Sequence, residues 1–370
     1  MKKKIITEIL SVCVFLGFIY TLSVANIFTP QRTFSENENR ELAQAPDFSL
    51  SNIFSGDFDT QFESWFADQF FHRDNWIEMK ASVRKDAGAI ENNGVYFARD
   101  DRLISQFTTA DETILNNNID YINEFSRDTG MQANIMLVPG AAYGERKFLP
   151  MGAWNLDEAQ MIRKIGKKFP DQNYIDLTDR IGNGNDYYFH TDHHWNEKGA
   201  QAGYEEICRT VLNKDPQSFT YRKVADDFHG TMYSKSGAFW ADGDPVYEII
   251  PARKNKVTVT YDGKKKGNSL FVSKNLKKKD KYTYYADGNH AIEDIQTSVK
   301  NGKTAVIVKD SYAHILLPYL AQEYSEIKMV DLRYYHQSVS NLIKDRKNTD
   351  LYFIYSLETF CSDTNLAQLF

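Results

Sequence analysis

The strongest constraint on the fold is an alternation of short apolar runs with helical segments. Buried strands are predicted at Ala133–Pro139, Tyr174–Leu177, Thr304–Lys309, Ile327–Leu332 and Leu351–Tyr355. Helices are predicted at 110–129, 157–168, 197–212, 312–323 and 337–346, and Gly130 is placed to cap the first of them. This alternation is typical of a parallel sheet flanked by helices. The sequence therefore predicts an α/β protein.

The stretch from Phe219 to Thr297 interrupts this alternation of strands and helices. It is rich in Lys, Gly and β-branched residues, and Val257–Tyr261 alternates in polarity before Asp262 and Gly263. An Asp-Gly pair after an alternating run is a hairpin signal. We therefore expect a β-rich insertion over 219–297. Its lysine clusters at 264–266 and 277–279 are typical of solvated hairpin tips, and contact with an anionic polymer or lipid is the alternative.

The N-terminus predicts export. Lys2, Lys3 and Lys4 precede an uncharged run from about Ile9 to Phe28, long enough to cross a bilayer as a helix. The lysines would hold the N-terminus in the cytoplasm and leave the rest of the chain outside the cell membrane. A cleaved signal peptide is the alternative, because Ser23 and Ala25 have small-x-small spacing. Both interpretations place the remaining residues outside the cytoplasm.

Three regions follow from these features. Residues 1–28 are expected to form a cytoplasmic tip and transmembrane signal-anchor, 29–90 a linker with aromatic-rich helices, and 91–370 the main α/β domain that carries the 219–297 insertion. The net charge of -6 gives no reason to expect a nucleic-acid partner. The three cysteines, Cys13, Cys208 and Cys361, show neither a disulfide framework nor a Cys-based metal site.

The densest cluster of chemically active residues is His190-Thr191-Asp192-His193-His194-Trp195-Asn196, which follows a strand and precedes a helix. In open α/β sheets, ligands bind at the carboxyl ends of strands. Three interpretations stay open. Asp192 and His194 could form a carboxylate–imidazole pair; His190, His193 and His194 could bind zinc; or the histidines could cap the following helix.

A nucleophile for the first interpretation stands in Lys309-Asp310-Ser311-Tyr312, directly after the Thr304–Lys309 strand. A serine at a strand-to-helix turn exposes its hydroxyl beside backbone N–H groups that can stabilise an oxyanion. The alternative is that Ser311 or Asp310 is only an N-cap. Arg333, at the end of the next strand, could bind a carboxylate or an oxyanion, or pair with Asp310 or Asp331 as structure. The combination predicts acyl transfer through Ser311, His194 and Asp192.

The residues TDHHWN at 191–196 resemble the motif that names the DHHW family, which is similar to the SGNH-hydrolase-like domains of the alginate O-acetyltransferases. The likeness covers nearly the whole exported chain. It includes the stretches SENENRELAQAP, FESWFADQFFHRDNW, NNGVYFARDDRLI, FHGTMYSKSG, VKDSYAH and VDLRYY. The resemblance implies that Asp192, His194 and Ser311 are catalytic.

It also implies a circularly permuted SGNH-hydrolase-like sheet. Ordinary SGNH enzymes place the serine first, whereas here the Asp-x-His pair comes first and the Ser311 strand follows it. The chain has no Gly in the second block, where Arg333 and Tyr334 stand, and no Asn in the third, where Ser356 stands. The identity of any oxyanion donor other than the Ser311 backbone N–H is therefore left open. The candidates for oxyanion or substrate contacts are Arg333, Tyr312, Ser356, His193 and Trp195.

The expected function is an O-acetyltransferase or acetylesterase that acts on a cell-surface or secreted polysaccharide. By resemblance, an integral-membrane acyltransferase of the MBOAT class would supply the acetyl groups, and neither a cofactor nor a metal is expected. The alternatives are a metal-dependent hydrolase that uses the His-rich motif and a non-catalytic polysaccharide assembly or binding scaffold.

Overall fold

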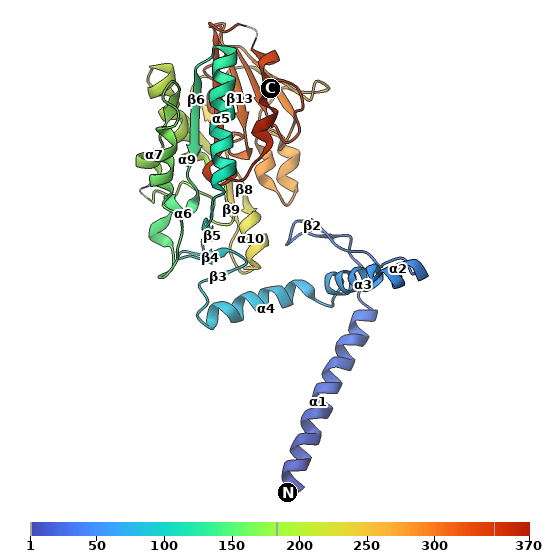
Figure 1. Cartoon of the computed structure of the whole chain (residues 1–370). Coiled ribbons are helices and arrows are strands. Elements are labelled where there is room, and N and C mark those ends of the chain that lie inside the picture. Colours follow the sequence, from blue (N-terminus) through green and yellow to red (C-terminus); the bar gives the residue numbers. More distant parts are fainter. Residues whose placement is uncertain (1, 183, 344) are drawn as a thin grey trace. The chain divides into compact units, whose positions relative to one another are not determined.

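The computed structural model describes residues 2–182, 184–343 and 345–370, with side chains from Ile5 onward. The chain forms two compact units: unit 1 comprises Met1–Gly88 and Gly237–Trp240, and unit 2 comprises Ala89–Ser236 and Ala241–Phe370. Figure 1 labels the elements of both.

Unit 1 begins with a long apolar helix, α1 (Lys2–Ile27). Its segment Ile5–Ile27 has a mean hydropathy of 2.1 and is long and apolar enough to cross a membrane. A short strand pair and three helices follow, namely β1 (Phe34–Ser35), β2 (Arg40–Glu41), α2 (Leu50–Ser55), α3 (Asp57–Asp68) and α4 (Arg73–Asp86). Ser49 caps α2 by accepting a hydrogen bond from the Asn52 backbone N–H.

Unit 2 is built on an eight-stranded sheet with the order β11-β10-β12-β14-β13-β15-β6-β7. Its strands are β6 (Ala133–Val138), β7 (Asn173–Ile175), β10 (Val257–Tyr261), β11 (Lys265–Gly267), β12 (Ile292–Thr297), β13 (Thr304–Lys309), β14 (Glu326–Val330) and β15 (Thr349–Ser356). The five strands from β14 to β7 are parallel. Counted from β13, they follow the flavodoxin-like order 2-1-3-4-5. The predicted parallel sheet is confirmed. The predicted circular permutation is confirmed too, because the first strand of this order is β13, which precedes Ser311.

Alternate residues of the sheet enter two separate apolar layers. On β13, Ala305 and Ile307 join one layer, while Val306 and Val308 join the other. The first layer contains apolar residues of α9 (Glu197–Ile207), and the second those of α5 (Glu112–Thr129) and α7 (Glu158–Gly166). Both faces of the sheet are thus covered by helices, which explains why its strands read as continuous apolar runs.

The predictions of α5, α7 and α9 are confirmed. Asp111 caps α5 at its start, and Gly130 ends it with a φ of 63°. The predicted helix 312–323 is wrong. Its place is taken by a 3₁₀ turn at Ser311–Ala313 and the four-residue α11 (Leu317–Leu320). This segment is apolar all round and contains Pro318, which lacks a backbone donor.

The predicted helix 337–346 is also wrong for the residues that the structure describes. Residue 344, which falls within this prediction, lies outside the described residues. A single 3₁₀ turn, Val339–Leu342, is found there. Ser338 caps this turn by accepting a hydrogen bond from the Ser340 backbone N–H. Short polar side chains of this kind compete with the helical backbone for hydrogen bonds.

The predicted β-rich insertion is confirmed. β8 (Phe219–Phe228) pairs with β9 (Asp244–Pro251) in a separate sheet, and α10 (Thr231–Ser236) lies between them in sequence. The predicted hairpin is formed by β10 and β11, with positive φ at Asp262 and Gly263. β10 and β12 extend the main sheet as antiparallel strands. The insertion is therefore continuous with the sheet that carries Ser311.

The remaining elements of unit 2 are short. They are the small sheet of β3 (Glu91–Asn92), β4 (Val95–Phe97) and β5 (Leu103–Ser105), and the helices α6 (Ala141–Gly144), α8 (Thr178–Ile181) and α12 (Leu357–Phe360). Cys208 and Cys361 are free and buried.

Candidate active site

The loop that carries the Asp-x-His pair is held by one carboxylate of the insertion. Asp244 accepts hydrogen bonds from the backbone N–H groups of His190 (2.7 Å) and Thr191 (2.8 Å). At the other end of the loop, Asn196 caps α9 by accepting from the N–H groups of Lys198 and Gly199. The interpretation of the histidines as helix caps is therefore wrong, because an amide fills that position.

Asp192 and His194 face each other in the interior. Asp192 is 3% exposed and its Oδ1 accepts hydrogen bonds from His194 Nδ1 at 2.5 Å and from the His194 backbone N–H at 3.0 Å. Its Oδ2 accepts from the Thr231 backbone N–H at 2.8 Å. Burial opposes ionisation of this carboxyl, but the charges of His193 and His194 and these hydrogen bonds hold its pKa below the usual range. The ionised carboxylate places the ring proton of His194 on Nδ1.

Gly230 permits the close approach of the insertion to Asp192. A Cβ atom at Gly230 would lie 2.3 Å from Asp192 Cβ and 2.4 Å from Oδ2, closer than any real contact. The backbone N–H of Gly230 donates to Thr191 Oγ1 at 3.0 Å. The sequence stretch FHGTMYSKSG therefore brings backbone against the Asp192 side chain, a role that its residue types alone did not reveal.

Ser311 stands at the carboxyl end of β13, between β14 and β15, where the order of the sheet reverses. Asp310 caps the 3₁₀ turn by accepting from the Tyr312 N–H at 2.9 Å, and it also accepts from the Ser356 N–H at 2.8 Å. The cap is therefore Asp310, and the Ser311 Oγ lies 2.8 Å from His194 Nε2. The structure thus brings Asp192, His194 and Ser311 into one hydrogen-bonded path.

Trp195 and Tyr312 connect the two loops. Trp195 Nε1 donates to the Tyr312 carbonyl at 2.8 Å, and the Tyr312 hydroxyl donates to the His193 carbonyl at 2.5 Å. Trp195 is fully buried and Tyr312 is 4% exposed. The full burial of Trp195 corrects its prediction as a substrate contact, whereas Tyr312 lines a small cavity beside Asp192 and His193, and its prediction as a substrate contact stays a prediction. The contacts of Trp195 and Tyr312 hold the Ser311 turn against the His194 loop.

Tyr282, from the insertion, covers the imidazole of His194. The two rings are stacked with centroids 3.8 Å apart and planes inclined by 10°. The Tyr282 hydroxyl donates to the Ser311 carbonyl at 2.9 Å. Sequence analysis missed this residue because it belongs to no motif, and the tyrosines of the insertion give no signal that separates it from its neighbours.

Replacing Tyr282 with leucine is expected to lower kcat/KM for an acetyl ester by about 10- to 100-fold, because the imidazole loses its stacking partner and its orientation. Tyr282→Phe keeps the ring and loses one hydrogen bond, so its loss should be about threefold to tenfold. Steady-state kinetics of the two variants, with thermal unfolding as the folding control, measure this order. Equal losses in both would show that the ring does not position His194.

Two other predicted residues are held by structural contacts. Arg333 Nε and Nη2 donate to Asp331 at 2.9 and 2.6 Å, so the pairing with Asp331 that the sequence left open is observed. The Ser356 N–H is bound by Asp310, and the Ser356 hydroxyl caps α12 by accepting from the Thr359 N–H at 3.1 Å. Among the groups that the sequence suggested, the Ser311 backbone N–H and His193 stay predictions as oxyanion donors.

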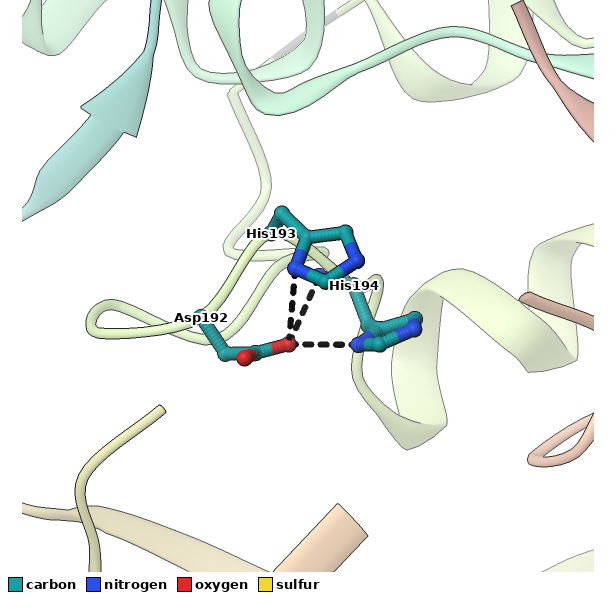
Figure 2. Close-up of side chains that lie close together, drawn as sticks. All are labelled: Asp192, His193 and His194. Carbon is teal, nitrogen blue, oxygen red and sulfur yellow. Dashed lines mark hydrogen bonds and ion pairs between the residues drawn. The ribbon is translucent and has the colours of Figure 1, made fainter. Parts of the chain in front are cut away.

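His193 lies beside the pair and is 36% exposed, with Nδ1 at 3.6 Å from Asp192 Oδ1. Figure 2 shows Asp192, His193 and His194 together, and their possible ligand atoms lie within 4.8 Å of one another. His190, predicted as a third histidine ligand, instead contacts Asp186 at 2.9 Å. An ion held by Asp192 and His194 Nδ1 would have to displace the 2.5 Å hydrogen bond between them.

A small cavity reaches the motif on the side of Asp192 and His193. Its lining includes Gly140, Glu158, Tyr312 and Glu358. Glu158 accepts a hydrogen bond from the Gly140 N–H at 2.6 Å, and burial raises the pKa of Glu158 to about 7. Below that pH this carboxyl is neutral, so it adds no full negative charge next to Asp192.

Comparisons with known proteins give one family match and several structures of similar fold. Residues 160–277 match the family described as ALGX, the SGNH hydrolase-like domain of acetyltransferase AlgX. The matched segment contains the TDHHWN motif and ends before Ser311. A search of curated proteins finds no match.

Two solved structures are similar to this chain in fold. A DHHW family protein from Eubacterium siraeum is 24% identical, with a TM-score of 0.64, and the alignment covers 75% of this chain and 95% of that one. Bacillus cereus PatB1, solved with a sulfonyl adduct, is 22% identical, with a TM-score of 0.59 and coverage of 73% and 97%. The predicted resemblance to DHHW and SGNH hydrolase-like proteins is confirmed.

Proposed function

We propose that this chain, which shares its fold with a DHHW family protein, is an exported serine acyl-transfer enzyme that acts as a polysaccharide O-acetyltransferase or acetylesterase. The observation that supports the proposal is the path from Asp192 Oδ1 to His194 Nδ1 (2.5 Å) and from His194 Nε2 to Ser311 Oγ (2.8 Å). An imidazole fixed by a carboxylate on one nitrogen and facing a hydroxyl on the other can activate that hydroxyl as a nucleophile.

In the first half-reaction, Ser311 Oγ attacks the carbonyl carbon of an acetyl ester while His194 Nε2 accepts the hydroxyl proton. Asp192 stabilises the imidazolium that forms, and the Ser311 backbone N–H stabilises the oxyanion. The bond to the leaving oxygen breaks, that oxygen takes the proton from His194, and acetyl-Ser311 remains. In the second half-reaction a sugar hydroxyl or water, deprotonated by His194, attacks acetyl-Ser311. The acetyl group is transferred and the Ser311 hydroxyl is restored.

The apolar helix α1 suits a tethered enzyme of this kind. If it stays in the membrane as a signal-anchor, it holds the chain beside a membrane-bound acetyl donor and raises the effective concentration of the two partners. We propose an MBOAT-class acyltransferase as that donor and a cell-surface or secreted polysaccharide as the acceptor. The match to a domain described as an acetyltransferase supports the acetyl group.

The decisive experiment detects the covalent intermediate. The full chain in detergent is incubated with an aryl acetate, quenched and digested, and mass spectrometry locates added acetyl groups. Acetylation of the peptide that contains Ser311 is expected in the wild type. It should be lost in His194→Ala, because no base then accepts the proton, and kept in His193→Ala, because His193 does not contact Ser311.

Three results would contradict the proposal: acetyl on other residues only, equal losses in the two histidine variants, or abolition of turnover by a metal chelator. The last would favour a metal-dependent hydrolase. Unchanged cellular function of Ser311→Ala would indicate a non-catalytic scaffold.

A further inference from the structure

Unit 1 carries a row of phenylalanines, which we name the phenylalanine stripe: Phe58, Phe62, Phe66 and Phe70. The first and last of them are half-buried. The spacing of four residues places the first three on one face of α3, and successive rings of the stripe lie 6.0, 6.2 and 5.7 Å apart between centroids. Phe62 is 42% exposed and Phe66 is 41% exposed. The row continues a run of exposed apolar side chains, since Phe48 and Phe54 of the same region are 76% and 87% exposed.

Unit 1 has little core of its own in which to bury this stripe. Of the described apolar residues between Ile5 and Gly88, Leu42 and Ala81 are the buried ones. Exposed apolar surface of this extent marks an interaction site. The surface that covers the stripe must therefore come from outside these residues.

The contact between α1 and the end of the stripe indicates what that surface is. The Phe71 backbone N–H, next to Phe70, donates to Asn26 Oδ1 at 2.8 Å. Asn26 stands at the end of the apolar run of α1, where Ile27 and Phe28 are 77% and 80% exposed. If α1 spans a bilayer, Asn26 lies at the boundary between lipid and water, and this hydrogen bond fixes one end of the stripe at the same level.

The charges on α3 show which kind of interaction could hold this helix at a membrane. The helix contains Asp57, Asp59, Glu63 and Asp68 and no Lys or Arg. Asp68 is paired with Arg40 at 2.5 Å, while Asp59 and Glu63 are exposed and flank the stripe, because each stands three residues before one of its phenylalanines. A helix whose aromatic face is flanked by carboxylates binds by burial of its apolar side chains and gains nothing from anionic lipid headgroups.

We infer that α3 lies on the outer surface of the membrane that α1 spans, with the phenylalanine stripe inserted among the lipids. Helices that lie in the membrane interface carry Trp, Phe and Leu on the face that enters the lipid. A helix of 12 residues is about 18 Å long, so the stripe extends the membrane contact well beyond the width of α1. The inference is independent of the acyl-transfer chemistry.

The test places a spin label on each face of α3 in the full chain. Cys13→Ser removes the exposed native thiol, and the buried Cys208 and Cys361 stay. A nitroxide is attached to Phe62→Cys or, as the matched control on the opposite face, to Ser64→Cys, since Ser64 is exposed. A third label at Leu16→Cys reports whether α1 is inserted. The protein is reconstituted in phosphatidylcholine vesicles, and power-saturation EPR measures the accessibility of each label to oxygen and to a water-soluble nickel chelate.

The ratio of oxygen to nickel accessibility is expected to be roughly threefold or more higher at position 62 than at 64, because oxygen concentrates in lipid and the chelate is excluded from it. Adding anionic lipid should leave the ratio at 62 unchanged or lower. Equal, water-like ratios at the two positions would overturn the inference, as would a water-like ratio at Leu16.

Low accessibility of position 62 to both reagents would show a protein contact instead and would also overturn the inference. Dipolar broadening that grows with protein density would identify a second copy of the chain as that contact. Because two single labels are compared, each variant is first checked by thermal unfolding against the unlabelled protein.

Discussion

Replacing Ser311 with alanine is expected to lower acetyl-ester turnover by on the order of 10⁴-fold or more, the loss typical of removing a triad nucleophile. The Ser311 Oγ is the atom that faces His194 Nε2 at 2.8 Å, and alanine leaves the imidazole without a hydroxyl to activate. Pre-steady-state and steady-state hydrolysis of an aryl acetate measure the effect, since the burst that reports acetyl-enzyme should disappear together with kcat.

Ser362→Ala is the matched control for this substitution. Ser362 is exposed and its hydroxyl bonds only nearby carbonyls of its own segment, at Glu358 and Thr359, so the same chemical change there should leave turnover unaltered. Both variants should unfold at the temperature of the wild type. Residual activity of Ser311→Ala within tenfold of the wild type would mean that another group is the nucleophile.

Asp192→Asn is expected to lower kcat by about 10⁴-fold while the fold is retained. The carboxylate accepts the His194 Nδ1 proton at 2.5 Å, which leaves Nε2 free to take the Ser311 proton. An amide at this position can donate to Nδ1 instead, and the ring proton then moves to Nε2, where it blocks proton transfer. Kinetics combined with the ¹⁵N chemical shifts of the His194 ring would show the loss of rate and the change of tautomer together.

Gly230→Ala tests the position of Asp192 without changing any group of the path. Its Cβ would meet Asp192 at 2.3 Å, so the carboxylate must move, and a displacement of this size is expected to cost about 100-fold in kcat. Gly267→Ala is the control, because the nearest atom to a Cβ there is 3.8 Å away. Full activity in Gly230→Ala would contradict the importance of the Asp192 position.

Much of the sheet could be predicted because its signals are local. The strands β6, β13, β14 and β15 are apolar runs buried on both faces, and such runs are visible without any knowledge of their neighbours. The helix predicted over 312–323 failed for a non-local reason. Its side chains are buried on all sides in the first apolar layer, so the pattern carried no helical periodicity, and Pro318 interrupts it.

The candidate site was only partly predictable. Asp192 and His194 stand two residues apart, and Ser311 follows a clear strand, so their chemistry could be suspected from residue types and spacing. Tyr282 and Gly230 reach the site from the insertion, where neither lies in a motif that points to His194 or Asp192. The sequence also left the role of Arg333 open, because its guanidinium could bind a carboxylate or an oxyanion, or could pair with Asp310 or Asp331.

The sequence by itself determined the α/β alternation, the apolar N-terminal helix and the candidate residues of the site, because periodicity, length and residue chemistry are properties of neighbours along the chain. Only the tertiary structure decided that His194 meets Ser311 across 117 residues and that Tyr282 stacks on the imidazole. Those contacts depend on strand order and loop closure, which a short stretch of sequence does not encode.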